Sequence, residues 1–379
     1  MSPATPGAPH ELPPATVPFP VAPSYQVRPD LVRLGQLPAH VDDPGAATLL
    51  RLDDGAPAAL AHALRELAEA PEAVHWADPK VGAERWWDIA SSVAHALAAD
   101  GDPRVGLVDA RGPMKDPLVG AAPAAAPMPA AAGPPALDRD RAAGIALPWL
   151  GLRLSSDGVL ERGDADPRTP RELADLAGPA ADALQRLPAA TRALNALRLS
   201  IAEDLVVLLR DRRGDGGRAG YLCVAAPSGW DPGARGNASF AALHAPVPRA
   251  GPLLSAGAAI ADAMVEKGPF VRYVWSLAAD EALSHHPRRH PAARLDDRDP
   301  ATWWLRVERQ TTLPLPRANA AAFFIRVLHR PLRQAVGPAG RRARLAAAVR
   351  SMDPALLAYK GLDGAAPALL RWLERGGVP

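Results

Sequence analysis

Residues 221–248, YLCVAAPSGWDPGARGNASFAALHAPVP, decide the expected fold of this chain. The first six residues, 221–226, are apolar and predict a strand, which a Pro-Ser-Gly loop ends. Residues 239–243 then predict a short helical turn that ends at His244, because two prolines follow and stop the helix. A strand that leads through a loop to a short helix can place one imidazole over a sheet. His244 is therefore either a ligand-binding residue or a histidine that caps a helix end.

Four further strands are predicted around this stretch. One precedes it, at 204–210, and three follow, at 270–277, 303–313 and 320–328, with a helix at 253–267 before them. Five antiparallel strands with helices inserted after the second strand is the order of a PAS-type domain. The expected fold class is therefore α+β: a PAS-like five-stranded antiparallel sheet with inserted helices on the ligand side, an N-terminal helical layer and C-terminal helices.

Composition divides the chain into five expected parts. They are a disordered tail at 1–24, an N-terminal helical region at 25–110, a Pro/Ala-rich linker or insertion at 111–148, a PAS-like core at 149–335 and C-terminal helices at 336–379 that pack on the core.

Charge and cysteine content exclude several classes of function. The 379 residues include 43 basic and 41 acidic side chains, a formal net charge of +2, which gives no electrostatic case for nucleic acid or membrane binding. The single cysteine, Cys223, excludes an intrachain disulfide, a four-cysteine zinc site and a cysteine-ligated iron–sulfur cluster within this chain.

Two further features bear on location and electron supply. The N-terminus lacks the pattern of a signal peptide, and no apolar run reaches about 18 residues, so we expect a cytoplasmic protein. No GxGxxG follows a strand and no P-loop occurs, so a redox enzyme built on this chain would receive its electrons from elsewhere.

Six short motifs occur at 200–209 (SIAEDLVVLL), 227–232 (PSGWDP), 244–248 (HAPVP), 306–316 (RVERQTTLPLP), 323–327 (FFIRV) and 356–361 (LLAYKG). In these motifs and their order, the chain resembles the alpha subunit of the heme-dependent oxidative N-demethylase family, long catalogued as a domain of unknown function. The resemblance covers about 195–375 and is weaker over 25–100. The chain departs from the family at Val274-Trp275, where relatives usually carry Asn-Trp, and at Leu313-Pro314, where they carry a basic residue.

The resemblance implies a PAS-fold oxidoreductase subunit that binds heme b. The family's activity is an oxygen-dependent monooxygenase reaction of amine metabolism, in which a small secondary alkylamine such as dimethylamine loses a methyl group as formaldehyde. Electrons come from NADPH through partner subunits that carry flavin and an iron–sulfur centre. The implied partners are thus a small alkylamine, O2 and reductase subunits.

His244 is the candidate metal ligand, because a neutral imidazole on a short helix is a common axial ligand of heme iron. The alternative is a histidine that interacts with the last carbonyls of its helix. Trp230 is a candidate for the lining of the heme site, although a buried aromatic is more often part of the core.

Glu203 and Asp204, at the start of the first predicted strand, are the candidate catalytic residues. Buried carboxylates favour a protonated amine and can relay protons to bound oxygen. The alternative is that Asp204 caps a turn and Glu203 is solvated.

Arg306 and Arg309 are candidates for the heme propionates, since a guanidinium matches a carboxylate. They are three apart on one strand and face opposite sides. Arg309 shares a face with Leu305 and Val307, where a charge is unusual unless paired, so it is the preferred candidate. Arg306 lies with Glu308 and Gln310 on a face that would otherwise be exposed and polar.

Two other functions remain compatible with the sequence. One is a PAS module that senses heme, a gas or another small ligand without turnover. The other is a heme-free scaffold subunit of a redox complex.

Overall fold

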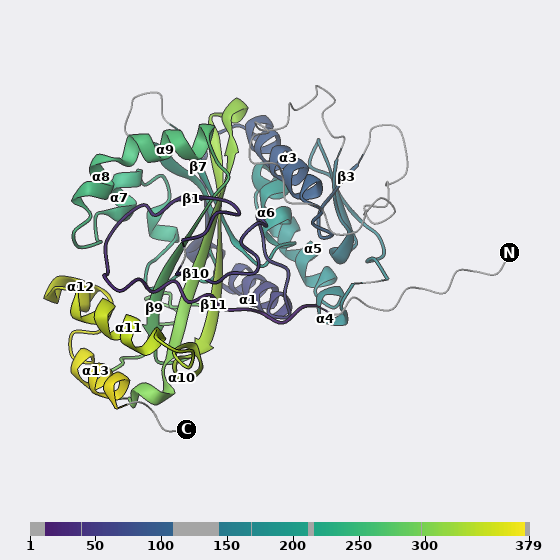
Figure 1. The fold of residues 1–379 in the computed structure, drawn as a ribbon. Coiled ribbons are helices and arrows are strands. Elements are labelled where there is room, and N and C mark those ends of the chain that lie inside the picture. The colour runs from purple at the N-terminus through teal and green to yellow at the C-terminus, as the bar shows by residue number, and fades with distance from the viewer. Residues whose placement is uncertain are drawn as a thin grey trace.

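The computed structural model describes residues 12–38, 40–108, 144–167, 169–210, 216–296 and 298–375. Figure 1 shows a central twisted sheet with helices on both sides, and a smaller sheet at the right. The chain is a mixture of helices and antiparallel sheet, which confirms the α+β class.

The central sheet has seven strands in the order β1-β9-β10-β11-β7-β8-β2, and all neighbours are antiparallel. The five predicted strands are its five central members, so the expected five-stranded sheet is enlarged by β1 and β2 from the N-terminal region. These two strands have two and three residues, too few for an alternating pattern to be recognised. The strands are β1 (Val32–Arg33), β2 (His75–Ala77), β7 (Asp204–Leu209), β8 (Arg218–Cys223), β9 (Phe270–Ala278), β10 (Trp304–Leu315) and β11 (Ala320–Pro331).

The strand register defines two faces of this sheet, because residues directly opposite each other in antiparallel strands point to the same side. The core face carries buried apolar side chains, among them Val207, Trp275, Leu305, Val307 and Phe324. The open face carries Arg272, Val274, Glu308, Gln310 and Ile325.

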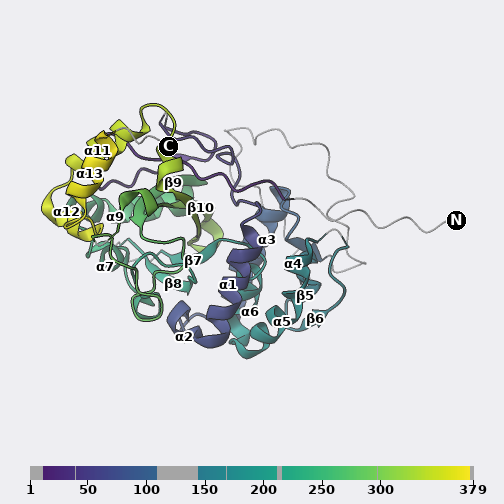
Figure 2. The same cartoon turned by 90° about the horizontal axis from the view of Figure 1, so that it is seen from below.

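Three helices between β8 and β9 cover one end of the open face: α7 (Phe240–His244), α8 (Gly251–Ser255) and α9 (Gly257–Glu266). Phe240, Ile260 and Met264 from these helices form an apolar cluster with Leu208 and Ala321 of the sheet. Figures 1 and 2 show α7 and α9 on the side of the sheet away from α3 and α6. The helix predicted at 253–267 is divided into α8 and α9.

An N-terminal layer covers the core face. It contains α1 (Ala56–Glu69), α2 (Pro71–Val74), α3 (Ala83–Ala99), α4 (Arg171–Ala174), α5 (Ala177–Arg186) and α6 (Arg192–Arg198). Apolar residues three or four apart, such as Trp86, Ile89, Val93 and Leu97, bury one side of α3 against the sheet cluster.

A four-stranded sheet, in the order β3-β4-β5-β6, belongs to the same layer: β3 (Gly106–Val108), β4 (Gly144–Leu147), β5 (Leu152–Ser155) and β6 (Leu160–Arg162). Of the linker predicted at 111–148, residues 111–143 lie outside the described residues, whereas the following residues form β4.

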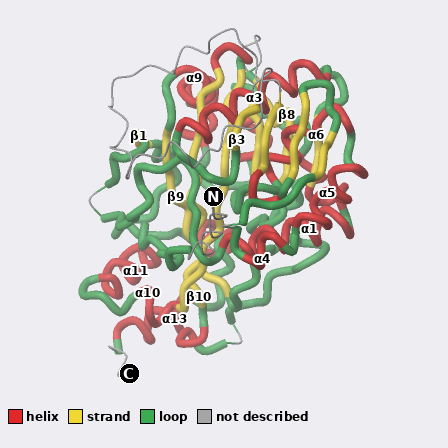
Figure 3. The backbone as a smooth tube through the Cα atoms, turned by 90° about the vertical axis from the view of Figure 1, so that its right-hand side faces the viewer, coloured by secondary structure: helices red, strands yellow, loops and turns green. Residues whose placement is uncertain are grey.

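The C-terminal helices are α10 (Leu332–Ala335), α11 (Arg341–Arg350), α12 (Pro354–Tyr359) and α13 (Ala366–Glu374), and Figure 3 shows α10, α11 and α13 together at one end of the central sheet. They form a second apolar cluster with Trp275 and Leu305. Phe19 and Val21, in the stretch that composition assigns to a disordered tail, are buried in this cluster. Two arginines of α11 lie over the Phe19 ring, at 4.9 and 5.2 Å. Across the described ranges, no helix is both long and apolar enough to cross a membrane.

Candidate functional site

The middle of the open face carries polar side chains on adjacent strands. Gln310 of β10 lies opposite Arg272 of β9, and Glu308 lies opposite Val274. Arg272, Val274 and Glu308 are all half-buried rather than enclosed. This part of the sheet can therefore contact a ligand, and the charge of Arg272 on this face acts on His244 of α7.

Glu308 is held as an acceptor of two hydrogen bonds. The Ser228 hydroxyl, from the loop after β8, donates to Oε1, and the Gln310 side chain donates to Oε2 at 2.7 Å. No arginine, lysine or histidine forms an ion pair with Glu308 within the described residues. The carboxylate is thus oriented but keeps a charge that a cationic ligand could neutralise.

Arg306 lies beside Glu308 and holds the loops around the open face. It is 1% exposed, and burial lowers its pKa to about 10. Its five N–H donors reach the Ser228 hydroxyl at 2.8 Å, the carbonyls of Ala226, Ala282 and Leu283 at 3.0, 3.0 and 2.9 Å, and His329 Nε2 at 2.9 Å. Because these bonds use every donor, Arg306 has no free fork to offer a propionate.

His244 ends α7, and its ring stacks on Phe240 with centroids 4.2 Å apart. Nδ1 lies 2.8 Å from the Phe240 carbonyl oxygen. Since a carbonyl oxygen only accepts, Nδ1 carries the proton and the lone pair is on Nε2. Burial lowers the pKa of His244, and the charge of Arg272 lowers it further, so the ring is neutral. No hydrogen bond to Nε2 is found in the described part of the chain.

Trp230 lies against the same region of the sheet. It packs on an apolar cluster of β8, as does Leu243, the residue before His244. The structure therefore places Trp230 and Leu243 of α7 on one apolar cluster of the sheet, and the role of Trp230 in lining a heme site stays a prediction.

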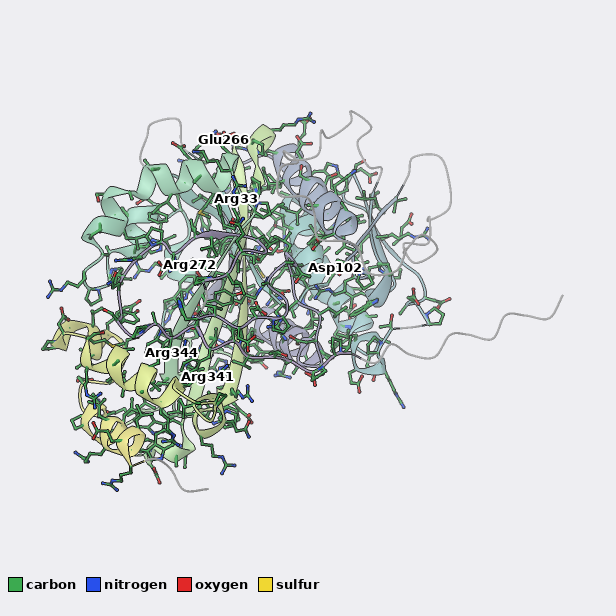
Figure 4. All side chains as sticks on the ribbon, in the orientation of Figure 1. Arg33, Asp102, Glu266, Arg272, Arg341 and Arg344 are labelled. Carbon is green, nitrogen blue, oxygen red and sulfur yellow. The ribbon has the colours of Figure 1, made fainter. Side chains whose placement is uncertain are left out.

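Arg272 extends from β9 on the open face and is labelled in Figure 4. Its Nε is buried and has no hydrogen-bond partner, and no ion pair involves this side chain within the described ranges. Burial lowers the pKa of Arg272, while Asp30, Glu308 and Tyr25 act in the opposite direction from a distance. A half-buried guanidinium without a bonded partner is costly, and this one is found beside the candidate ligand.

Arg309, the preferred propionate partner from sequence, faces the other way. It is 1% exposed on the core face, and its Nε donates to Asp43 Oδ2 at 2.9 Å. Its other nitrogens donate to the carbonyls of Gly45, Thr48 and Leu49. The unusual charge on an apolar face is thus paired, and its partner, Asp43, is in the N-terminal layer.

Glu203 also belongs to the N-terminal layer. It is 1% exposed, accepts from the Arg51 backbone N–H at 2.7 Å, and lies 3.9 Å from Arg104. It is neither solvated nor hydrogen-bonded to His244 in the described chain.

Asp204 is fixed at the start of β7. It binds Arg198 at 2.7 Å and accepts from the backbone N–H groups of Ala225 and Ala226 at 2.8 and 3.1 Å. These contacts join β7 to the end of β8. They match the turn-capping alternative for Asp204 and leave its carboxylate little capacity for a substrate.

Three residues that sequence reasoning did not select, Arg272, Glu308 and Lys360, lie in or beside this region. Strand alternation grouped Glu308 with Arg306, but an exposed polar face explained that pattern equally well. Only the register between β9 and β10 shows that Arg272 lies on the same face as Glu308. Over the described residues, no group of three or more His, Cys, Asp or Glu side chains could hold a metal ion. A metal at His244 would therefore need ligands beyond those that the described residues supply, as in a heme.

Two comparisons with known proteins bear on these residues. The comparison with curated proteins returned no match. A family model described as haem-dependent oxidative N-demethylase, alpha subunit-like, matches residues 176–370, which is more than half of the chain and includes His244, Arg272 and Glu308. The chain belongs to this haem-dependent oxidative N-demethylase alpha subunit-like family.

Proposed function

We propose that this protein is the heme-binding subunit of an oxygen-dependent N-demethylase that removes a methyl group from a small alkylamine and releases formaldehyde. The observation that carries the proposal is His244: its Nδ1–H is held by the Phe240 carbonyl and its Nε2 is free, beside a face that bears an oriented carboxylate. A backbone hydrogen bond to one ring nitrogen is the usual support of a metal-bound histidine.

The residues present fit a heme. His244 supplies a neutral imidazole, and apolar side chains around the open face (Val206, Trp230, Val274 and Ile325) suit a porphyrin. The buried, unbonded Nε of Arg272 suits a propionate. A heme bound there would supply the oxygen chemistry of the reaction.

We propose Glu308, in place of Glu203 and Asp204, as the residue that binds the amine. At neutral pH a small alkylamine is a cation, and Glu308 is a half-buried carboxylate without an ion-pair partner in the described chain. The Ser228 and Gln310 hydrogen bonds fix its position. Its charge would hold the amine nitrogen and accept a proton from it.

Electron supply is assigned to partner subunits. The sequence has no dinucleotide fingerprint, and the family's description as an alpha subunit implies others. We propose a reductase that carries flavin and an iron–sulfur centre and uses NADPH. We also propose that the five central strands, with α7 to α9 inserted after the second, form a PAS-like unit.

Reconstitution with heme b tests the ligand. We expect a Soret band in the wild type and a shifted or weakened band in His244→Ala, with His95→Ala on α3 as the control histidine. Absence of a Soret band in the reconstituted wild type would contradict the proposal and favour the scaffold alternative.

Turnover distinguishes an enzyme from a sensor. The heme-loaded protein is incubated with dimethylamine, oxygen and an artificial reductant, and formaldehyde is measured. We expect release that depends on both oxygen and amine. A heme-bound protein that releases none across a panel of alkylamines would instead indicate a sensor.

A further inference from the structure

Arg272 has an environment that its structural role does not explain. Its register partner Gln310 donates to Glu308, and within the described residues the Gln310 amide oxygen accepts no hydrogen bond from Arg272. The charges of Asp30 and Glu308 act on Arg272, yet neither acid is in ion-pair contact with it. A cation in this position lowers the stability of the protein unless an anion binds to it.

Lys360 is a second cation at the same edge of the sheet. It follows α12, and its Nζ donates to the backbone carbonyl of Trp275 at 2.7 Å. The ammonium also lies 5.0 Å from the Tyr25 ring centroid and 5.6 Å from that of Trp275. One carbonyl and two ring faces leave part of its hydrogen-bonding capacity unused, because an ammonium has three donors.

Arg272 and Lys360 lie along the same strand, because Lys360 binds the backbone carbonyl of Trp275, three residues after Arg272 on β9. Burial and, to a smaller extent, the charge of Arg272 lower the pKa of Lys360 to about 8, against the charge of Glu308. Glu308 itself forms no ion pair with either cation within the described residues. These two cations without an ion-paired anion make this edge of the sheet positively charged, and the charge of Arg272 also lowers the pKa of His244.

We propose that Arg272 and Lys360 form a carboxylate-binding site at the β9 edge of the open face, and that its ligand is a heme propionate. This inference rests on the proposed heme function. The two arginines considered from sequence are unsuitable, since the donors of Arg306 and Arg309 are already bound to carbonyls, a hydroxyl, a histidine and Asp43. Arg272 provides a planar fork for the carboxylate, and Lys360 provides a point charge.

The experiment compares two ligands that differ only at the carboxylates. Heme b and its dimethyl ester are titrated into heme-free protein, and the Soret band gives each dissociation constant. The variants are Arg272→Gln, Lys360→Gln and, as control, Arg33→Gln, an exposed arginine on the adjacent strand β1 (Figure 4).

We expect the wild type to bind heme b roughly tenfold to a hundredfold more tightly than the ester, the range typical of a charge-assisted hydrogen bond. Arg272→Gln should remove most of this preference by weakening heme b alone, and Lys360→Gln should remove part of it. Arg33→Gln should retain it.

Thermal unfolding of the heme-free variants separates a binding role from a structural one. Removing an unpaired, half-buried charge should leave the melting temperature of Arg272→Gln unchanged or raise it. A clearly lower melting temperature would assign Arg272 a structural role and overturn the inference.

The remaining outcomes are distinct. If the wild type binds neither porphyrin, the proposed function is overturned together with this assignment. If the wild type binds heme b and Arg272→Gln keeps the full preference over the ester, the carboxylate site is overturned and the heme proposal stands.

Discussion

Asp43 and Arg309 form an ion pair at 2.9 Å that is closed to solvent, with the Arg309 side chain 1% exposed and that of Asp43 fully buried. Asp43 also binds Arg51 at 3.3 Å and accepts from the Tyr273 hydroxyl at 2.5 Å. The pair joins the N-terminal layer to β10 and β9. Arg309 therefore stabilises the core face of the sheet, and the candidate site lies on the opposite, open face.

Breaking this pair should destabilise the fold without altering the site. Asp43→Asn leaves the Arg309 charge buried and unpaired, and we expect a loss of about 3–5 kcal/mol in the free energy of unfolding. Denaturant unfolding measures it, with Asp42→Asn as control, because the Asp42 side chain is 82% exposed. Heme affinity of the folded fraction should be unchanged. A second variant, Arg309→Met, tests the propionate role. If it binds heme b more weakly than the wild type does but binds the dimethyl ester equally well, Arg309 contacts a propionate.

Glu308→Gln should lower turnover and leave heme in place. The amide keeps the shape of the carboxylate but loses the charge that would hold a protonated amine. We expect kcat/KM for dimethylamine to fall roughly 10²-fold or more, the usual range for a residue that transfers a proton. The Soret spectrum should not change. The exposed Glu161→Gln on β6 is the control. Unaltered kinetics in Glu308→Gln would exclude this residue as the amine-binding group.

Alternation along β10 correctly separates Arg306 and Arg309 onto opposite faces. It cannot show which face is buried, because the partner of Arg309 lies 266 residues away in the sequence and carries no local signal. The apolar Leu305 and Val307 beside Arg309 were consistent with a pocket and with a core. The C-terminal helices and the N-terminal layer cover that face, which makes it the core.

The site is only partly predictable for the same reason. Proline positions and the capping Ser239 define α7 and its end at His244, so that ligand candidate follows from sequence alone. Arg272 and Glu308 become neighbours through the β9–β10 register, and Lys360 joins them through a contact with the backbone of Trp275, 85 residues away. Neither relationship has a local pattern.

His329 should make the protein sensitive to acid. Burial, then the charge of Arg306, lowers its pKa from 6.5 to about 3. Its neutral form accepts a hydrogen bond from Arg306. The unfolded chain therefore binds more protons than the folded one between these values, and stability is lost as pH falls from about 6.5 toward 3.

His329→Gln can still accept from Arg306 but does not titrate. We expect its unfolding free energy to depend less steeply on pH in this window, by roughly one proton. His75, whose pKa burial lowers to about 4, keeps part of the slope in both proteins. Urea unfolding from pH 7 to 4 gives the slopes, with His95→Gln as control. Equal slopes in wild type and His329→Gln would show that His329 does not contribute to the pH dependence of the unfolding free energy.

The lowered pKa of Lys360 predicts how heme affinity changes above neutral pH. Burial, and then the positive charge of Arg272, lower the pKa of Lys360 to about 8 in the heme-free protein. A bound carboxylate favours the charged amine, so binding takes up a proton once the pH exceeds this value. Affinity for heme b should therefore be constant below about pH 7 and decrease as pH rises through 8 to 9.

The matched variants isolate this titration from that of the heme itself. Lys360→Arg stays charged and should bind heme b with little dependence on pH, whereas Lys360→Gln should show a partial loss of affinity that is the same at every pH. The exposed Lys267→Gln should behave as the wild type. The dimethyl ester supplies the baseline, because changes at the iron affect both porphyrins but Lys360 acts only on the free carboxylate. A decline that is the same for heme b and its ester, or that persists in Lys360→Arg, would assign the pH dependence to another group.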